Sequence, residues 1–497
     1  MREPILEEGN TCWRKVRADK VSFIVDAADY FAAAKEAILQ ARHSVYLIGW
    51  EFDLEIRLRP DVDDPEVPDQ LRQFLQFVVE NRPELEIFVL QWRGAMLFNI
   101  ARQLGSYLLL KARAKPQIHF RLDSEHPAGA CHHQKIVVID DAIAFCGGID
   151  MTSGRWDTRS HLSADHRDGL PWHDMTWALD GEVARSLGEL ARWRWKNATG
   201  DELPIPPRCH AIWPEQLAPD LYDAVVGIAR TSPGYGDNPR IEEIEKLWCA
   251  AIRSAERTIY IENQFLSSGK ISHAIKSKLE EEGGPEIVII LPFSAESWLE
   301  SEAMDSRRSF ILDDLRKSDR EDRLGVYHPV NANGEPIYVH AKLLLVDDSF
   351  VRVGSSNMAS RSLAADSECD LAMEAVDQPE LKDILVNFRT RLLAEHLGVP
   401  VETIEAELES TEGSVRKVIE RLRKTNGRSL RVLEASELNE SEKALAESRL
   451  MDPEEPINAW RRVAGFAKRE VRRKRVLATL GGLAIGGLVA RQFIRRP

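Results

Sequence analysis

The stretch His132–Asp150, HHQKIVVIDDAIAFCGGID, decides the fold, because the same pattern returns later in the chain. Its counterpart, HAKLLLVDDSFVRVGSSN, runs from His340 to Asn357. In each copy a histidine and a lysine two positions apart precede an apolar run, an Asp-Asp pair and a second apolar run. Alternate strand residues share a face and Asp-Asp favours a turn. Each copy therefore predicts a buried β-hairpin that presents an imidazole and an ammonium together.

Two further pairs of segments match in the same order. ARHSVYLIGWEF at 41–52 resembles AERTIYIENQF at 255–265, and PELEIFVLQW at 83–92 resembles GPEIVIILPF at 284–293. The tyrosine of the first segment precedes the motif histidine by 87 residues in one half and by 80 in the other. Matched segments in one order and at similar spacing indicate a duplicated domain.

Helical patterns separate the apolar runs. One opens after Asp26, a candidate helix cap, and its counterpart covers residues 238–255. Alternating strands and helices predict α/β architecture, with a first domain at 1–213 and a second at 214–395. The charged region 396–460 carries no strand signal, so we expect a helical appendage and linker there.

Charge, cysteine content and the first residues argue against a nucleic-acid-binding protein and against a secreted, disulfide-bonded one. The 497 residues carry a net charge of −14, which argues against general affinity for nucleic acid. The six cysteines are scattered and form no CxxC pair, as in a reduced intracellular protein. The first ten residues lack the basic and apolar regions of a secretory signal.

The last segment, residues 461–497, differs from the rest. It holds 11 Lys/Arg and one Glu, a net charge of +10, so the remainder of the chain carries −24. Its apolar run at 476–490 makes a helix of about 22 Å, shorter than a bilayer core. We expect this basic, Gly-rich segment to associate with an anionic membrane surface on the cytoplasmic side. A helix packed on the body is the alternative.

The two His-Lys pairs suit one type of chemistry. Two lysines neutralise a phosphate diester and the charge that develops during transfer. One imidazole attacks phosphorus while the other protonates the leaving oxygen, because imidazole titrates near neutrality. The residues alone leave open which histidine takes which part.

This pattern resembles the phospholipase D superfamily, whose members carry HxKx4Dx6G(G/S) twice. The flanks GGIDMTSGRWDT and IYIENQF look like the phospholipid-hydrolysing members of eukaryotic type and their bacterial relatives. The resemblance implies two tandem, pseudo-twofold related domains, each a mixed and mostly parallel sheet flanked by helices. It also implies cleavage of the distal phosphodiester bond of glycerophospholipids through a phosphohistidine, with phosphatidate or a transphosphatidylation product formed. Neither a cofactor nor a metal is expected.

The resemblance also assigns residues. It makes His133 the nucleophile and His340 the general acid, and it places Lys135 and Lys342 on the phosphoryl oxygens. Ser355 and Asn357 add hydrogen bonds to the phosphate. The motif aspartates Asp140 and Asp347 complete the two catalytic signatures, although their strand-end position favours a role in supporting the fold.

A carboxylate is expected behind each imidazole to fix its tautomer. Asp174 and Glu368 begin matching apolar runs, and we expect Asp174 to serve His133 and Glu368 to serve His340. His132 faces away from His133 by strand alternation, so it is expected to be a structural partner.

The sequence leaves two roles near the first motif undecided, that of Asp150 and that of the insert that follows it. Asp150 stands where the second motif has Asn357, which argues against contact with phosphate there. The insert after the first motif is 13 residues longer than its counterpart, and Arg155 and Trp156 in it are candidates for headgroup contact or for a packed loop.

Three other functions compete with the phospholipase. A cardiolipin synthase-like phosphatidyltransferase shares both motifs. A nuclease is disfavoured by the acidic body, and an inactive membrane scaffold by the intact motifs. We expect a phospholipid substrate, a membrane surface as partner through the basic tail, no nucleic acid, and a monomer.

Overall fold

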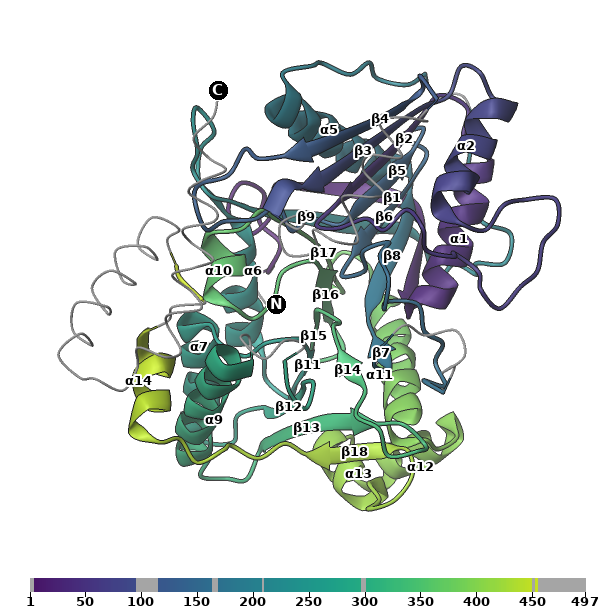
Figure 1. Cartoon of the computed structure of the whole chain (residues 1–497). Coiled ribbons are helices and arrows are strands. Elements are labelled where there is room, and N and C mark those ends of the chain that lie inside the picture. Colours follow the sequence, from purple (N-terminus) through teal and green to yellow (C-terminus); the bar gives the residue numbers. More distant parts are fainter. Residues whose placement is uncertain are drawn as a thin grey trace.

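The computed structural model describes residues 4–94, 115–162, 169–207, 210–295, 301–448 and 452–454. Within these ranges the protein is built on a 16-stranded sheet flanked by helices, so the predicted α/β class is confirmed. Figure 1 shows the strands of the two halves meeting at β1, β9 and β17, with α1 and α2 on one flank and α6, α7 and α9 on another.

The sheet takes its strands from both halves of the chain. The first half contributes β1 (Arg14–Val25), β2 (Ser44–Gly49), β3 (Glu86–Trp92), β4 (Ile118–Asp123), β5 (Ile136–Ile139), β6 (Ile143–Gly147) and β8 (Met175–Asp180). The second contributes β9 (Leu221–Ser232), β10 (Ile241–Glu242), β11 (Thr258–Glu262), β12 (Glu286–Ile290), β13 (Leu324–Val330), β15 (Leu343–Val346), β16 (Phe350–Gly354), β17 (Glu368–Glu374) and β18 (Ser429–Val432). A separate pair is formed by β7 (Trp172–His173) and β14 (Tyr338–Val339).

Helices cover both faces of this sheet. Those of the first half are α1 (Ala27–Leu39), α2 (Leu71–Asn81) and α5 (Gly181–Thr199). Those that follow are α6 (Glu243–Ser254), α7 (Gly269–Glu280), α9 (Ser306–Ser318), α10 (Ser360–Ala364), α11 (Leu381–Leu397), α12 (Val401–Ser410), α13 (Val415–Leu422) and α14 (Glu440–Ser448).

The strand order is the same in both halves and runs outward from the centre. One side reads β1-β8-β6-β5-β2-β3-β4 and the other reads β9-β17-β16-β15-β11-β12-β13. The halves join where β1 pairs antiparallel with β9, in a register that sets Arg14 opposite Ile228 and Val21 opposite Leu221. Within the second half, β9 also pairs antiparallel with β17 on its other side.

The sheet is mixed, but the expectation that each half is mostly parallel was wrong. Among the described strands, parallel pairing within this sheet is confined to β2-β3-β4 and β11-β12-β13. Helices α2, α7 and α9 lie in the described connections between these strands. The strands of each motif hairpin pair antiparallel because a tight turn connects them. The central strands β1 and β9, where the halves join, also pair antiparallel.

The motif hairpins form as predicted. Both residues of each Asp-Asp pair have left-handed backbone, with φ of 53° and 51° at Asp140 and Asp141 and 53° at both Asp347 and Asp348. Two successive positive φ values give the turn whose twist matches the flanking strands. The turns therefore set the register of β5 against β6 and of β15 against β16.

Alternation along the strands divides the core into separate layers. One face of the first half packs on α1 and α2, and the equivalent face of the second half packs on α6, α7 and α9. The opposite face belongs to a single cluster that includes residues of α5 and α11 and runs across both halves. The junction between the halves is thus part of the core.

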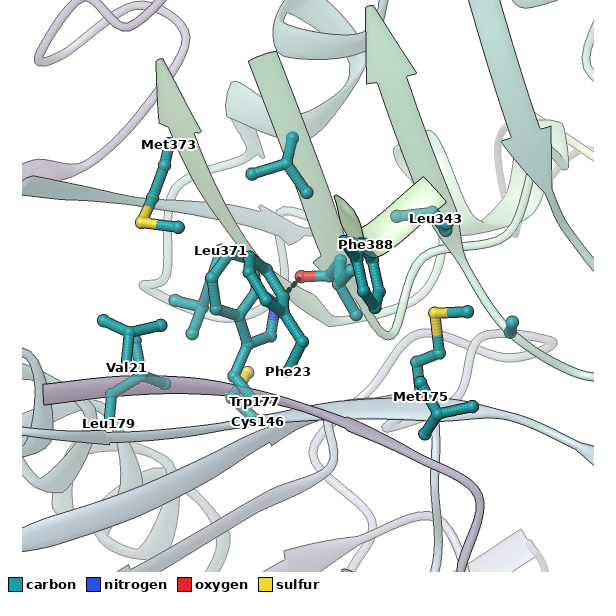
Figure 2. Packing of buried hydrophobic residues seen from close by; sticks show 14 of the residues in the cluster. Val21, Phe23, Cys146, Met175, Trp177, Leu179, Leu343, Leu371, Met373 and Phe388 are labelled. Carbon is teal, nitrogen blue, oxygen red and sulfur yellow. Dashed lines mark hydrogen bonds between the residues drawn. The ribbon is translucent and has the colours of Figure 1, made fainter. Parts of the chain in front are cut away.

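Trp177 lies at the centre of this shared cluster. Its indole Nε1 donates a 3.0 Å hydrogen bond to the carbonyl oxygen of Val353 in the other half. Its ring centroid is 4.7 Å from that of Phe23, which stacks at 4.6 Å on Phe388 of α11 (Figure 2). The buried tryptophan therefore joins β8 to β16 directly and is linked to α11 through Phe23 of β1.

Two local expectations were wrong. Asp26 precedes α1, but its carboxylate makes no capping hydrogen bond; it faces His173, 3.1 Å from that imidazole's Nδ1. The region after residue 395 is not helical throughout, because β18 pairs antiparallel with β13 and adds a strand to the sheet. Four residues, one of them charged, gave too short a pattern to recognise as a strand.

The basic segment at 461–497 lies outside the described residues. Among the helices that are described, none combines the length and the apolar character needed to cross a bilayer.

Trp177→Phe is expected to lower the free energy of unfolding by about 2 kcal/mol, because a buried carbonyl loses its donor and the core loses volume. Chemical denaturation measures the change. Trp193→Phe is the matched control: Trp193 of α5 is half-buried, and we expect it to change stability by less than about 1 kcal/mol. Equal effects of the two substitutions would contradict the role given to Trp177.

Candidate functional site

The two motif histidines are held by the opposite halves of the chain. The His133 N–H donates to the Ser367 carbonyl oxygen at 2.9 Å, and the His340 N–H donates to the His173 carbonyl oxygen at 2.7 Å. Each acceptor is the residue directly before one of the two expected carboxylates. The backbone of each motif is therefore attached to the strand of the other half.

The side chains cross in the same way. His133 Nδ1 lies 2.9 Å from Glu368 Oε2, and His340 Nδ1 lies 2.6 Å from Asp174 Oδ2. The two carboxylates were predicted correctly as imidazole partners, but the pairing was wrong: each histidine uses the carboxylate of the other half. An ionised carboxylate accepts from Nδ1–H, which leaves the Nε2 lone pair free for chemistry.

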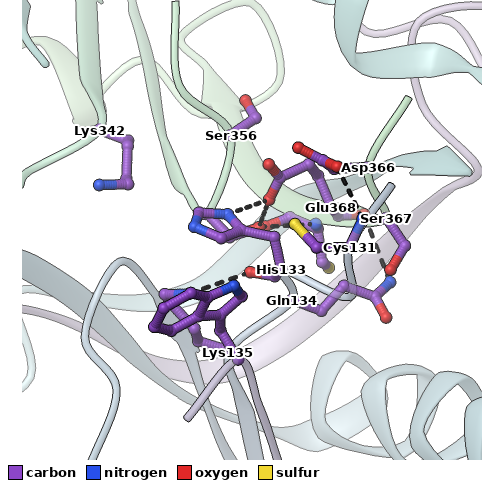
Figure 3. A network of polar contacts seen from close by, with 12 residues as sticks. Cys131, His133, Gln134, Lys135, Lys342, Ser356, Asp366, Ser367 and Glu368 are labelled. Carbon is purple, nitrogen blue, oxygen red and sulfur yellow. Dashed lines mark hydrogen bonds and ion pairs between the residues drawn. The ribbon is translucent and has the colours of Figure 1, made fainter. Parts of the chain in front are cut away.

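The motif lysines lie beside the histidines. Lys135 Nζ donates to the His133 carbonyl oxygen at 3.2 Å, and Lys342 Nζ donates to the His340 carbonyl oxygen. Figure 3 shows Lys135 and Lys342 on different sides of the His133 imidazole, whose Nδ1 points to Glu368. The charges of both lysines act on His133, so the two motifs share one site.

Burial dominates the electrostatics of this site. It lowers the pKa of His133 and of His340 well below the ordinary range, and the lysine charges lower both further. Burial also lowers the pKa of Lys342 to about 7. It raises the pKa of Asp174 to about 7 and that of Glu368 to about 8. The buried site therefore favours the neutral forms of its histidines, of Lys342 and of its carboxylic acids, and an anion bound there would stabilise the charged lysines.

Asp150 supplies part of that stabilisation in the first half. Its Oδ2 pairs with Lys135 Nζ at 2.9 Å, and its Oδ1 accepts from the backbone N–H of Trp50 at 3.0 Å. The residue thus fixes the lysine, which agrees with the argument that an aspartate does not contact phosphate. The equivalent Asn357 leaves Lys342 without such a carboxylate partner at this position.

The carboxylates of the motif aspartates are bound to backbone N–H groups at strand starts, as the support role requires, and their catalytic part stays a prediction. Asp140 accepts hydrogen bonds of 2.6–2.8 Å from the backbone N–H groups of residues 42–44. Asp347 accepts bonds of 2.8 Å from those of residues 256–258. Each carboxylate thus fastens the motif hairpin to the start of the neighbouring strand, β2 or β11.

Ser355 also has a different role from the one expected. It is fully buried, and its hydroxyl donates to Glu368 Oε2 at 2.5 Å, so it holds the carboxylate that orients His133. Its equivalent is Gly148, where any Cβ would lie 2.2 Å from Asp174 Oδ1. The glycine therefore gives Asp174 the space that the serine fills with a hydrogen bond.

The predicted contact of Asn357 with phosphate stays a prediction. The side chain is nearly buried, and its Oδ1 has no hydrogen-bond partner among the described residues. His132 is confirmed as a structural partner: its Nδ1 lies 3.0 Å from Asp123 Oδ2, and both side chains are fully buried.

The insert after the first motif reaches the second one. Trp156 is packed in the core of the first half, so it is not a headgroup contact. Arg155 stacks its guanidinium 3.8 Å from the Trp172 ring centroid, and that ring lies 5.1 Å from the His340 ring. The Arg155 charge lowers the pKa of His340.

Sequence reasoning missed three residues around His340. Tyr338 stacks on Trp172 with ring centroids 4.6 Å apart, and its hydroxyl accepts from Gln264 Nε2 at 3.0 Å. Gln264 Oε1 in turn lies 3.4 Å from Lys342 Nζ. Gln264 stands in the repeated IYIENQF segment, which was a usable signal; the two aromatic residues gave none.

Groups that can hold a metal ion lie beside the site. Two overlapping sets of histidine and carboxylate ligands share His173, the residue before Asp174.

Known proteins are similar in sequence to most of this chain. Phospholipase D A of Dictyostelium discoideum is 26% identical over 470 residues, which cover 76% of this chain and 36% of that protein. Phospholipase D alpha 1 of Carica papaya is 25% identical over 514 residues, which cover 74% of this chain and 64% of that protein. The chain is thus similar to proteins named phospholipase D over about three quarters of its length.

Two further comparisons agree with this similarity. A family model described as cardiolipin synthase, PLD-like domain, matches residues 248–391 of this chain. The crystal structure of phosphatidylserine synthase from Haemophilus influenzae Rd KW20 has the same fold, with a TM-score of 0.50 and 14% identity over 75% of this chain and 87% of that one. The matched regions span less than two thirds of the length of the two relatives named above.

Asp140→Ala and Asp347→Ala are each expected to lower the free energy of unfolding by about 3 kcal/mol, because three backbone N–H groups lose a charged acceptor. Denaturant titration measures this. Asp63→Ala, at an exposed position, is expected to change stability by less than about 0.5 kcal/mol. Folded enzyme of either variant should keep its turnover, and a loss of turnover in stable protein would establish a catalytic role.

Glu368→Gln is expected to change how stability depends on pH. Burial raises the pKa of Glu368 from 4.5 to about 8, so its protonated form is favoured in the folded protein. The resulting contribution is complete below pH 4.5 and disappears as pH rises through about 8. The native protein should therefore lose on the order of 3 kcal/mol more than the variant between pH 5 and pH 9. Parallel curves from denaturation at each pH would contradict the shift.

Proposed function

We propose that this chain is a phospholipase D, which cleaves the distal phosphodiester bond of glycerophospholipids to phosphatidate and a free alcohol. One observation carries the proposal: two imidazoles, each oriented by a carboxylate and each beside a lysine, are brought into one buried site from the two halves. An anionic diester supplies the negative charge that this site lacks. The 26% and 25% identical relatives named phospholipase D support the choice of substrate.

The first step is transfer of the phosphatidyl group to the enzyme. The Nε2 lone pair of His133 attacks phosphorus, and the bond from phosphorus to the headgroup oxygen breaks. That oxygen takes a proton from His340 and leaves as an alcohol. The negative charge of the bound diester raises the pKa of His340 and of Lys342. Both side chains are then protonated, as the step requires.

The second step releases the product. His340, now neutral, takes a proton from water, whose oxygen attacks phosphorus and breaks the bond to His133. A primary alcohol in place of water gives the transphosphatidylation product. Lys135, Lys342 and the Asn357 amide bind the phosphoryl oxygens in both steps, while Asp174 and Glu368 orient the imidazoles.

The catalytic unit consists of two repeats, at residues 1–213 and 214–395. The matching strand orders support this division, and β9, the first strand of the second repeat, begins at Leu221. The region 396–460 completes the second sheet through β18. A monomer suffices because one chain supplies both His-Lys pairs.

The enzyme acts at a membrane surface because its substrate is there. The basic segment at 461–497 would bind anionic lipid on the cytoplasmic side, an expectation that rests on its charge and apolar run alone.

Phosphatidyl transfer of the cardiolipin synthase type is the second candidate, favoured by the family model that matches residues 248–391. It shares the first step and differs only in the acceptor, which is a lipid alcohol rather than water.

Incubation with vesicles of phosphatidylcholine, phosphatidylethanolamine and phosphatidylglycerol plus 1-butanol separates these functions. A phospholipase D should release phosphatidate and phosphatidylbutanol, and lipid mass spectrometry should find neither with His133→Asn. Cardiolipin as the main product would establish the second candidate. Cleavage of single-stranded DNA without consumption of lipid would refute both.

A substrate with a p-nitrophenol leaving group assigns the two histidines, because nitrophenolate leaves without a proton. With phosphatidyl-p-nitrophenol, His340→Asn should still release one nitrophenolate burst, and His133→Asn should release none. Stopped-flow absorbance follows the release, and His119→Asn, in β4, is the matched control. A burst in His133→Asn but not in His340→Asn would exchange the two roles.

A further inference from the structure

A second buried cluster lies directly behind the site. It consists of Asp26 between β1 and α1, His161 in the insert, His173 in β7 and Glu395 in α11. All four are buried or nearly so, and one ligand atom from each lies within 4.8 Å of the others. The proposed lipid chemistry uses none of these side chains.

The distances within the cluster match those around a metal ion. His173 Nδ1 is 3.1 Å from Asp26 Oδ1 and 3.5 Å from Glu395 Oε1. His161 Nε2 is 3.3 Å from Glu395 Oε1 and 3.8 Å from Asp26 Oδ2. A tetrahedral zinc ion with bonds of about 2.1 Å separates its ligands by roughly 3.4 Å. Two imidazoles and two carboxylates are a ligand set that divalent transition metals accept.

The outer nitrogens of both imidazoles are bound to further carboxylates. His161 Nδ1 lies 3.1 Å from Asp157 Oδ2, and His173 Nε2 lies 2.8 Å from Glu262 Oε2. This is how proteins fix metal-ligating histidines: a carboxylate holds the outer N–H and leaves the inner nitrogen for the ion. Glu262 is itself held by His396 Nε2 at 2.9 Å.

Inward-facing atoms of the cluster lack hydrogen bonds. His173 Nδ1 and Asp26 Oδ2 are fully buried, yet neither makes a well-aligned hydrogen bond to a described residue, although Asp26 Oδ1 lies 3.1 Å from His173 Nδ1. Such atoms are costly unless something binds them. Asp26 and His161 also have left-handed backbone, with φ of 69° and 54°, which non-glycine residues hold only where the surroundings demand it.

The charges of the cluster call for a cation. Asp26 and Glu395, with Asp157 and Glu262 behind the imidazoles, bring four carboxylates together. The opposing cations that the structure describes at Glu395 are Arg428 and Arg159, each 3.5 Å from one of its oxygens. Two negative charges remain when the histidines are neutral. One dication or two protons would balance them.

We propose that Asp26, His161, His173 and Glu395 bind a divalent transition-metal ion, with zinc as the best fit. The ion does not touch the lipid; it positions the site. His173 is the link, because its carbonyl oxygen accepts the His340 N–H at 2.7 Å and the next residue, Asp174, holds the His340 imidazole. The ion therefore fastens the insert, β7 and α11 to the second catalytic motif.

The metal content of the untagged full-length protein tests this directly. After dialysis without chelator, inductively coupled plasma mass spectrometry should find roughly one zinc ion per chain. His161→Gln and Asp26→Asn should each lose it. His119→Gln, which alters a histidine outside the cluster, should retain it.

A measurement on the native protein guards against variants that fail to fold. Zinc added to chelator-treated protein should raise Tm by about 3 °C or more, and cobalt in its place should give the visible absorption of a tetrahedral site. No shift with zinc, manganese or calcium would overturn the proposal and leave a cluster neutralised by protons. Undiminished zinc in both His161→Gln and Asp26→Asn would also overturn it. These readouts need no lipid, so they are independent of the proposed activity.

Discussion

The site depends on one constraint: each catalytic imidazole takes its carboxylate from the other half of the chain. The sheet makes this possible, because Glu368 opens β17 and Asp174 directly precedes β8, and both strands flank the central pair of β1 and β9. A carboxylate at the start of a central strand reaches across to the opposite hairpin. Neither half alone can therefore orient its own histidine, and the shared core around Trp177 keeps the two halves in the one placement that does.

Burial gives the site its reactivity. Lysines and imidazoles in a medium of low polarity lose much of the free energy that water would give their charged forms, so their pKa values fall, while those of the carboxylates rise. The proposed phosphate diester would reverse this balance on binding. Recognition and protonation would then be one event, and Lys342, which lacks the aspartate partner that Lys135 has in Asp150, would gain most from the anion.

The sequence allowed much of this to be predicted, because the hairpins and the His-Lys pairs are local patterns. Asp140 and Asp141 predict a turn from local sequence alone. The crossing of Asp174 and Glu368 was beyond reach: each follows the motif of its own half, which favoured pairing within a half, and only the meeting of β1 with β9 decides which histidine each one faces. Asp26 was read as a helix cap since its position fits, but long-range attraction to His173 outweighs the local hydrogen bond.

The strand β18 was also missed, yet it determines what the second half presents to its surroundings. It pairs with β13 and becomes the edge strand, so the sheet ends in four residues of open backbone N–H and C=O groups in place of the seven of β13. Such rows recruit strands from other molecules. The four residues from Ser429 to Val432 therefore act as a cover against self-association, and a chain shortened ahead of them would be prone to aggregate although every catalytic residue remained.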